Sequence, residues 1–217
     1  MLLNEKLKTQ LEKSLSAYVD KAVTINNFEI LGGGSINTAL RIKTSGADFF
    51  VKLNHSAKYP GMFDAEAKGL KLLASANIIT LPGVIDTGII DDVVFILLEF
   101  IIPGKRISNF FSDFGMRLAA IHRNSSVYFG LDHNNYIGSL KQSNIQQKNG
   151  IMFFIHERLQ VQVALAKRNR LIDTTTLSQF EKLYQHLGQM LPKEKPALLH
   201  GDLWSGNFLT GTDGAAC

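Results

Sequence analysis

The chain has 217 residues, of which 45% are hydrophobic and 19% are charged, a composition typical of a globular protein. Its net charge of +4 reflects 23 Lys and Arg residues against 19 Asp and Glu residues, an excess too small and too scattered to indicate nucleic-acid binding. The single cysteine, Cys217, excludes an intrachain disulfide and a cysteine-built metal site, so we expect a reducing, cytoplasmic environment.

The first part of the sequence predicts a sheet accompanied by two helices. Leucines recur at every fourth position from Leu3 to Leu15, which is the spacing of an amphipathic helix. Short apolar and β-branched runs follow, separated by brief turn signals, and this pattern favours antiparallel strands. The strands are expected at residues 22–31, 38–43, 49–53, 83–90 and 93–102, and a second helix at 62–76. Even the most apolar run, 93–102, is interrupted by Glu99 and is too short to cross a bilayer, so no membrane partner is expected.

From Pro103 and Gly104 onward the pattern becomes helical. Periodic apolar residues predict helices over residues 108–123, 153–170 and 176–190. A polar, turn-rich segment separates the first two helices, and a short apolar strand is expected at 197–199. We therefore predict an α+β fold with two lobes, residues 1–102 carrying the antiparallel sheet and residues 103–217 carrying most of the helices. Ligands favour the cleft between two such lobes.

The strongest chemical signal follows the last expected strand and reads His200-Gly201-Asp202-Leu203-Trp204-Ser205-Gly206-Asn207. An Asp followed by an Asn at this spacing matches the catalytic loop of kinases, in which the carboxylate accepts the proton of the attacking hydroxyl and the amide holds Mg²⁺ on the phosphates. Asp and Asn are also frequent turn residues, so the pair alone is weak evidence. With His, Gly and Trp in place after a strand, the pattern favours catalysis by Asp202 and metal binding by Asn207.

A second signal is Lys52, which lies among apolar residues of the third expected strand. A lysine in such a strand needs a partner, because burying an unpaired ammonium is costly. Glu66, in the first turns of the following helix, can supply one, and a strand lysine paired with a helix glutamate orients the phosphates of ATP in kinases. The alternative is a solvent-facing lysine on an edge strand and a glutamate on an exposed helix face.

Two further segments are candidates for nucleotide binding. A glycine run lies between the first two strands, where glycine lets backbone N–H groups approach phosphate oxygens, although a simple hairpin turn is an equal alternative. The run is neither a Walker A loop nor G-x-G-x-x-G, so it indicates neither a P-loop nor a Rossmann fold. In a two-lobed kinase, the extended linker at the end of the sheet offers backbone groups to adenine. The candidates are Gly32, Gly33, Gly34 and Ser35 for phosphate, and Glu99 and Ile101 for adenine.

These residues together resemble the fructosamine kinase (ketosamine 3-kinase) family. The likeness rests first on residues 199–207, in which Trp204 distinguishes the family from aminoglycoside and choline phosphotransferases. Further segments that look like the family are 32–37, 50–52, 62–67, 129–138 and 154–159. The resemblance implies a protein-kinase-like fold and transfer of the γ-phosphate of ATP, with Mg²⁺, to O3 of a ketosamine borne by a small amine or a protein lysine.

The resemblance also implies roles for individual residues. They are Asp202 as the base, Asn207 as a Mg²⁺ ligand, Lys52 as the phosphate anchor and Glu66 as its partner. The segment 132–138 and Arg158 are expected on the substrate side. The alternative for Asp132 and His133 is that both are polar loop residues.

One departure from the family concerns its second metal ligand. The family places an Asp in an Asp-Pro-Ala-like motif shortly after the Asn, whereas this sequence passes Gly211-Thr212-Asp213-Gly214 and stops at Cys217. Asp213 falls within an expected turn and is a poor substitute. On the sequence we therefore expect an incomplete C-terminal lobe, poor metal binding, marginal stability, at most trace activity and self-association.

Three functions remain open at this point. The first is a ketosamine kinase, and the second is a phosphotransferase for another small alcohol such as an aminoglycoside, choline or a sugar. The third is an inactive pseudokinase that binds nucleotide or a partner. Trp204 favours the first over the second, and the missing Asp is the only support for the third.

Overall fold

The computed structural model describes residues 3–32 and 36–217, in two compact units. The first unit comprises Met1–Ala120 together with His200–Cys217, and the second comprises Ile121–Leu199. The last segment of the chain therefore belongs to the same unit as the N-terminal sheet.

Backbone hydrogen bonds explain why the final segment joins the first unit. The Gly104 N–H donates to the carbonyl of Thr210 (2.8 Å), and the Ile107 N–H donates to the carbonyl of Gly214 (3.3 Å). The compact units consequently differ from the division between residues 102 and 103 expected from the sequence, and that division into lobes stays a prediction.

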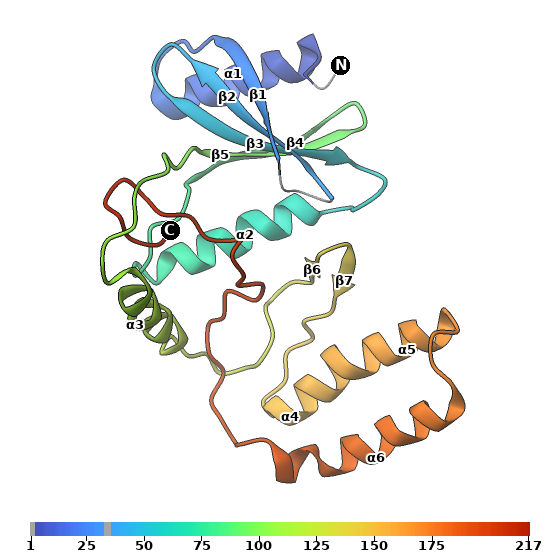
Figure 1. Ribbon diagram of the computed structural model, residues 1–217. Helices are drawn as coiled ribbons and strands as arrows, with labels where there is room; N and C mark the ends of the chain where they lie inside the picture. The colour runs from blue at the N-terminus through green and yellow to red at the C-terminus, as the bar shows by residue number, and fades with distance from the viewer. Residues whose placement is uncertain (1–2, 33–35) are drawn as a thin grey trace. The chain divides into compact units, whose positions relative to one another are not determined.

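A five-stranded antiparallel sheet dominates the first unit (Figure 1). Its strands are β1 (Ile25–Leu31), β2 (Thr38–Thr44), β3 (Asp48–His55), β4 (Val84–Ile90) and β5 (Val93–Glu99). The order is β1-β2-β3-β5-β4, so the fifth strand lies between β3 and β4 instead of at the edge that a simple meander would give it. Residues 94–98 are buried without interruption, which suits a central strand covered on both faces.

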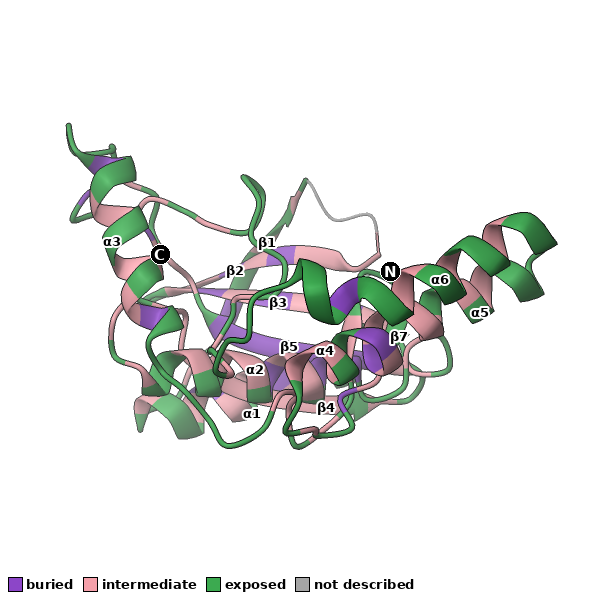
Figure 2. Ribbon diagram, turned by 90° about the horizontal axis from the view of Figure 1, so that it is seen from below, coloured by how far each residue is buried: buried purple, intermediate pink, exposed green. Residues whose placement is uncertain are grey.

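Helix α1 (Glu5–Val19) and helix α2 (Met62–Ser75) lie on opposite sides of this sheet (Figure 1). The first begins at Asn4, whose side chain accepts a hydrogen bond from the Leu7 N–H (2.9 Å). Figure 2 shows the buried residues concentrated in the middle of the sheet and the helix faces against it. The core beside α1 includes Leu7, Leu11, Leu15, Leu40, Ile42, Phe49, Val51 and Leu53. Most of helix α3 (Phe110–His122) also belongs to this unit.

The second unit is mainly helical. A continuous helical segment consists of α4 (Gly150–Phe153), a π-helical turn η1 (Phe154–Leu159) and α5 (Gln160–Arg168), and it runs beside α6 (Thr174–Met190) (Figure 1). The sequence predicted this segment as one regular helix. A short hairpin of β6 (Asn135–Ile137) and β7 (Leu140–Gln142) lies in the stretch predicted only as turns.

The strand predicted at 197–199 is wrong. Ala197 forms only an isolated bridge with Ser125, and the Leu198 N–H donates to the carbonyl of Asn124 (2.8 Å). A strand needs a neighbouring strand to satisfy its backbone, and here the partner segment pairs at a single position.

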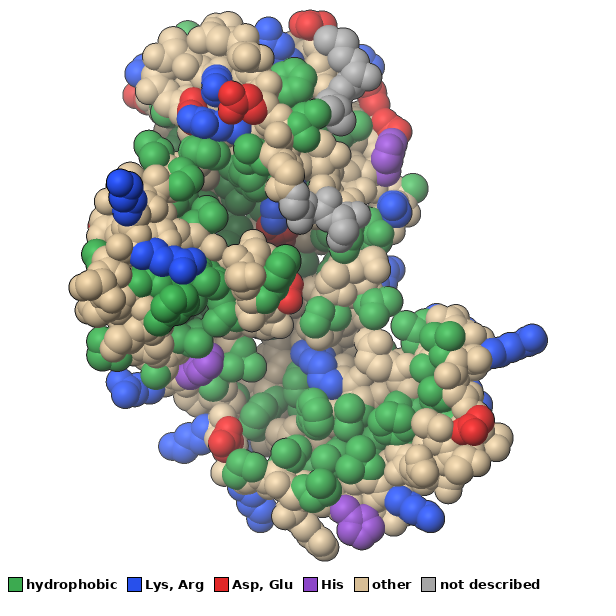
Figure 3. Space-filling model, viewed as in Figure 1, with side chains coloured by type: hydrophobic (Ala, Val, Ile, Leu, Met, Phe, Trp, Pro, Cys, Tyr) green, Lys and Arg blue, Asp and Glu red, His purple; other side chains and the backbone are tan. Residues whose placement is uncertain are grey.

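Figure 3 shows hydrophobic side chains gathered on the face of the second unit that is turned to the viewer. Exposed large hydrophobic residues of this unit include Ile137, Leu140, Met152 and Phe154. Within the described residues, no helix combines the length and the apolar character that crossing a membrane requires.

Candidate active site

The strand lysine and the helix glutamate form an ion pair in the first unit. The Nζ of Lys52 lies 2.6 Å from Oε1 of Glu66, and the two side chains are 31% and 27% exposed. Partial shielding from water strengthens such a pair relative to one on the open surface. The ion pair expected from the sequence is present, and it orients the ammonium of Lys52 toward Glu66 on α2.

The alternation of side chains along β3 explains why Lys52 meets α2. Odd-numbered residues 49–53 are buried beside α1, and successive side chains of a strand point to opposite faces. Lys52 therefore points to the face that α2 covers with Glu66. Its sheet neighbours are Ala39 on β2 and Ile96 on β5, so it lies on an interior strand and the edge-strand alternative is wrong.

The side chain of Asn207 connects the two ends of the candidate catalytic loop by hydrogen bonds to Asp202. The Nδ2 of Asn207 donates to the carbonyl oxygen of Asp202 (2.8 Å) and to its Oδ2 (2.9 Å). Gly201 has φ of +88°, a left-handed conformation that favours glycine immediately before the Asp. Within the described part of the chain, the Oδ1 atoms of Asp202 and Asn207 accept no hydrogen bond, so both remain available to other groups.

Trp204 and Gly206 are coupled inside this loop. The Asn207 N–H donates to the carbonyl of Trp204 (2.9 Å), which places the indole, 56% exposed, over Gly206. A Cβ at Gly206 would lie only 2.5 Å from the indole. The Trp-x-Gly-Asn spacing therefore has a steric reason.

Aromatic packing anchors the end of the loop to α3. The ring of Phe208 lies 5.0 Å from that of Phe114 and 6.1 Å from that of Phe110, measured between centroids. Arg106 stacks on the same cluster, with its guanidinium carbon 4.8 Å from the Phe110 centroid. No role for Arg106 or Phe208 was apparent from the sequence, because only the fold brings the segments before residue 121 and after residue 199 together.

His200 is half-buried and neutral imidazole is its favoured form. Desolvation by burial lowers the pKa of His200, while the carboxylate of Asp202 opposes that shift. The Asp202 N–H donates to Nδ1 of His200 (3.3 Å), a bond that requires this nitrogen to be unprotonated. The imidazole of His200 thus accepts a hydrogen bond from the backbone N–H of Asp202, two residues later, and helps to fix the backbone of the loop.

The proposed adenine contacts differ in their availability. The Glu99 N–H already donates to the carbonyl of Gly83 (3.0 Å), and its carboxylate accepts hydrogen bonds from the Gly83 N–H (2.8 Å) and the Tyr18 hydroxyl (2.6 Å). That last hydrogen bond raises the pKa of Tyr18. Ile101 lies in the extended segment after β5, where its backbone makes no hydrogen bond to the described residues. Of the two, Ile101 is the one with free backbone groups.

The glycine run lies largely outside the described residues. Gly33, Gly34 and Ser35 are in the gap, and no geometry is assigned to them. Gly32 is described, directly after β1, and a Cβ there would meet nothing within 4 Å. Phosphate binding by this run stays a prediction.

The substrate-side candidates belong to the second unit, where they have structural partners. The guanidinium of Arg158 donates to the carbonyl of Ser143 (2.5 Å) and to Oδ1 of Asn144 (2.7 Å), and it stacks on Phe153. Asn144, which is buried, in turn donates to the carbonyl of His133 (2.9 Å). Arg158 therefore connects η1 to the segment that surrounds the β6–β7 hairpin. The importance of Asn144 was not apparent from the sequence.

The turn expected around Asp213 is present. The Gly214 N–H donates to the carbonyl of Gly211 (2.9 Å), and Oδ1 of Asp213 accepts from the Ala215 N–H (3.0 Å). One carboxylate oxygen of Asp213 is thereby used within the turn itself. Among the described residues, no group of three or more His, Cys, Asp or Glu side chains is arranged to hold a metal ion.

The sheet, the Lys52–Glu66 pair and the loop at Asp202 define a protein-kinase-like fold, and solved structures share it. A putative fructosamine-3-kinase from Haemophilus somnus 129PT matches with a TM-score of 0.84 and 29% identity over 97% of this chain and 73% of that one. Aminoglycoside phosphotransferase APH(4)-Ia matches with a TM-score of 0.59 over 96% of this chain and 69% of that one. At 15% sequence identity, this match supports a shared fold and no statement about function.

The chain belongs to the fructosamine kinase family, whose profile matches residues 7–217. It is 32% identical over 187 residues to the probable ketoamine kinase YniA of Escherichia coli K12, an alignment covering 85% of this chain and 64% of the relative. It is 35% identical over 197 residues to the chloroplastic protein-ribulosamine 3-kinase of Arabidopsis thaliana, covering 87% and 58%. The chain thus spans somewhat less than two thirds of the length of these relatives. The resemblance seen in the sequence and the predicted fold class are both confirmed.

Proposed function

We propose that this protein transfers the γ-phosphate of ATP to a sugar hydroxyl of a ketosamine, at O3. The observation that carries the proposal is the Lys52–Glu66 ion pair (2.6 Å) in a member of the fructosamine kinase family. This pair is the element that kinases use to orient the phosphates of ATP. The names of the relatives, ketoamine kinase and ribulosamine 3-kinase, support a ketosamine as the acceptor.

In this proposal Asp202 acts as the general base and Asn207 as the ligand of the metal ion. Oδ1 of Asp202 is free of hydrogen bonds to the described residues and is suited to accept the proton of the sugar hydroxyl. The amide of Asn207 donates its N–H to Asp202, which leaves its carbonyl oxygen for a cation. The two hydrogen bonds from Asn207 to Asp202 fix the position of Oδ1 of Asp202 relative to Oδ1 of Asn207.

The donor set fits Mg²⁺ bound with a nucleotide. Magnesium prefers oxygen ligands and is usually held by few protein groups together with substrate phosphates and water. Asn207 supplies such an oxygen, and Lys52 supplies the positive charge for the phosphates. When bound, the metal neutralises charge on the phosphate oxygens during transfer.

Mass spectrometry provides the test, because it detects a phosphorylated product that accumulates over time. The protein is incubated with Mg-ATP and, separately, with fructosyl-lysine, ribulosyl-lysine, kanamycin and choline. We expect a phosphorylated product with the two ketosamines only, carrying phosphate at O3 by NMR. Phosphorylation of kanamycin or choline instead would refute the acceptor class. ATP binding by calorimetry without transfer to any acceptor would favour the inactive nucleotide-binding alternative.

A further inference from the structure

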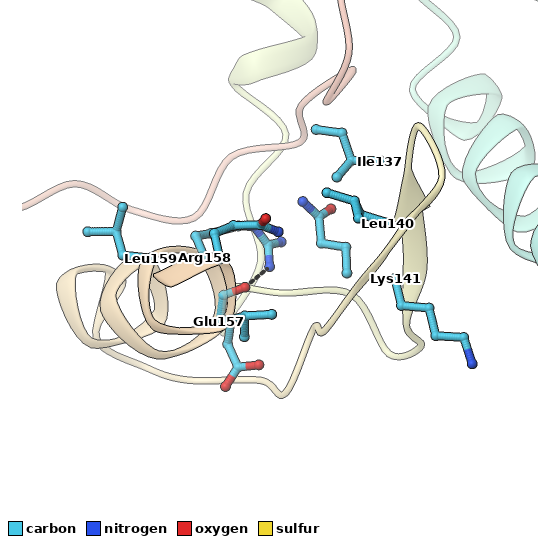
Figure 4. Close-up of a pocket in the computed structure, with 9 residues that line it drawn as sticks. Ile137, Leu140, Lys141, Glu157, Arg158 and Leu159 are labelled. Carbon is cyan, nitrogen blue, oxygen red and sulfur yellow. Dashed lines mark hydrogen bonds between the residues drawn. The ribbon is translucent and has the colours of Figure 1, made fainter. Parts of the chain in front are cut away.

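The second unit contains a pocket of about 430 Å³ between the β6–β7 hairpin and the helical segment η1–α5 (Figure 4). Figure 4 shows the carboxylate of Glu157 pointing away from Ile137 and Leu140, which line the pocket from the hairpin. Leu159 and Val161 add apolar surface from the helical side. Apolar surface of this kind can cover apolar groups of many sorts, so the pocket does not identify a ligand.

In the first unit, one carboxylate connects three elements at the end of the sheet. Oε1 of Glu99, the last residue of β5, accepts a hydrogen bond from the hydroxyl of Tyr18 on α1 (2.6 Å). Oε2 of Glu99 accepts a hydrogen bond from the N–H of Gly83, directly before β4 (2.8 Å). Each carboxylate oxygen therefore has its own donor, and α1 is attached at the point where β4 begins and β5 ends.

The periodicities of α1 and β5 explain why Tyr18 and Glu99 meet. The buried leucine stripe of α1 ends at Leu15, and a helical residue three positions later lies on the same face. Leu97 on β5 belongs to the core beside α1, so Glu99, two residues later in the strand, points to the same side. The tyrosine and the glutamate thus face each other across the edge of that core.

The residue after Glu99 is held from the opposite face of the sheet. The ring of Phe100 lies against the guanidinium of Arg41, whose central carbon is 4.6 Å from the ring centroid. Nε of Arg41 donates to Oδ2 of Asp48 (2.7 Å), which fixes the direction of the guanidinium. Because Leu40 and Ile42 are buried on the α1 side, Arg41 projects from the other face of β2. Side chains on both faces of the sheet therefore hold residues 99 and 100.

These contacts fix the start of the extended segment that contains the adenine candidate. Ile101 follows immediately, and its backbone makes no hydrogen bond to the described residues. A backbone group binds a ligand better when its direction is set in advance, because ordering a loose segment costs conformational entropy on binding. The Tyr18 hydroxyl stays protonated and able to donate at neutral pH, since its hydrogen bond to Glu99 raises its pKa.

We propose that Tyr18 is a positioning residue for the nucleotide: acting through Glu99, it fixes the linker whose backbone at Ile101 binds adenine. This inference rests on the proposed function, because it takes residues 99–101 as the adenine-binding linker. Helix α1, which covers the face of the sheet opposite to Lys52, thereby contributes to nucleotide binding (Figure 1).

Calorimetry of the whole chain with Mg-ATP and with Mg-tripolyphosphate separates the adenosine part of the nucleotide from its phosphates. Tyr18→Phe removes only the hydroxyl and should weaken Mg-ATP binding roughly two- to tenfold, the range that one net hydrogen bond supplies. Binding of tripolyphosphate should stay unchanged, because the phosphates are held by other residues. Equal affinity of the variant and the wild type for Mg-ATP, or an equal loss for both ligands, would overturn the proposal.

Two further variants separate positioning from a general effect on stability. Lys6→Met is the matched control, because Lys6 attaches the same helix to Asp91 (3.0 Å) in the turn at the far end of β4 and β5, and it should leave ATP affinity unchanged. Glu99→Ala should weaken Mg-ATP binding at least as much as Tyr18→Phe, and combining the two should cost nothing more, because both remove one hydrogen bond. Additive losses in the double variant, or a loss in Lys6→Met equal to that in Tyr18→Phe, would contradict the proposed role.

Hydrogen exchange measured by NMR without nucleotide gives a readout that does not depend on the proposed function. The amides of Gly83 and Glu99, which both hydrogen-bond across the end of the sheet, should exchange faster in Tyr18→Phe than in the wild type and in Lys6→Met. Unchanged exchange would show that the linker is held without Tyr18. Failure of the wild type to bind Mg-ATP would refute the proposed function together with this inference, whereas equal binding by wild type and Tyr18→Phe would refute the role of Tyr18 alone.

Discussion

Lys52 lies on an interior strand with its ammonium held by a single carboxylate, and this arrangement separates it from the surface lysines of the sheet. Lys43 on β2 also pairs with a glutamate, Glu29 (2.5 Å), but this partner is 45% exposed, whereas Glu66 is 27% exposed. The two lysines therefore form a matched pair for testing which ammonium serves the phosphates.

Lys52→Met should abolish ketosamine phosphorylation and weaken ATP binding, because the variant removes the charge facing the phosphates while keeping a long apolar side chain. Lys43→Met should retain both properties. Calorimetry with Mg-ATP and product detection by mass spectrometry measure the two effects. Normal turnover in a folded Lys52→Met protein would contradict the assignment.

Asp202→Asn should act on the chemical step. General bases contribute about 10²–10⁴-fold, so the rate of product formation should fall by roughly this factor with little change in ATP affinity. The control is Asp213→Asn, since Asp213 is engaged in its own turn and should leave the rate unaltered. A collapse of ATP affinity in Asp202→Asn would instead make this residue a metal ligand.

His200 predicts a dependence of stability on pH. Its pKa is lowered in the folded state, so as the pH falls through its ordinary value of about 6.5 the unfolded chain takes up a proton first. The contribution of His200 to stability is therefore complete above pH 6.5 and is lost as the pH falls through the lower folded value. Urea unfolding at about pH 7 and 5 should show a smaller loss in His200→Asn than in the wild type. Equal losses would show that His200 does not contribute.

At the scale of elements, the guanidinium of Arg158 connects η1 to residues 143 and 144, directly after the β6–β7 hairpin. Burial lowers the pKa of Arg158, with the Glu157 carboxylate opposing the shift, and the planar group joins Ser143 and Asn144 at once. An ammonium cannot reproduce this fork. Interactions at Arg158 thus stabilise the second unit in addition to shaping its pocket.

Arg158→Lys should destabilise the protein by roughly 1–3 kcal/mol, the cost of leaving buried acceptors unsatisfied. Hydrogen exchange should become faster across residues 135–142, whereas exchange in the five-stranded sheet should stay unchanged. Arg168→Lys, at the exposed end of α5, is the control and should have no effect. Unaltered exchange in the hairpin of Arg158→Lys would show that other contacts hold it.

At the scale of the whole molecule, the first unit is closed by a segment that lies far away in the sequence. Residues 104–107 hydrogen-bond with residues 210–214, so the loop at Asp202 is attached to the sheet-bearing unit through backbone contacts. A Cβ at Gly104 would collide with the carbonyl oxygen of Gly211. Glycine at position 104 is therefore required for the approach of the two segments.

Gly104→Ala should destabilise the protein by about 1–3 kcal/mol, because overpacking forces the two segments apart. Fluorescence of Trp204, the single tryptophan, reports on the segment after residue 199 during urea unfolding. Gly115→Ala on α3 meets nothing within 4 Å and should instead stabilise by roughly 0.5–1 kcal/mol. A Gly104→Ala protein as stable as the wild type would refute the closure argument.

Local pattern alone predicted most elements and located the candidate catalytic loop, whose chemistry stays a prediction. The leucine repeat of α1, the alternation of β3 and the His-Gly-Asp sequence are short-range signals, and each is present in the structure as a helix, a strand and a loop. The ion pair of Lys52 and Glu66 was also predictable, because a lysine between apolar residues of a strand requires a nearby carboxylate. The family followed from the same residues.

Only the tertiary structure decided what depends on contacts between distant segments. The central place of β5, the packing of Phe208 on α3 and the hydrogen bond of Arg158 to Asn144 all arise from such contacts. None of them leaves a periodic trace in the sequence, because a side chain's partner is set by how elements pack and not by its neighbours along the chain. The residues that could carry phosphate transfer are therefore readable from the sequence, whereas the pocket in the second unit emerges only when the hairpin and the π-helical turn come together.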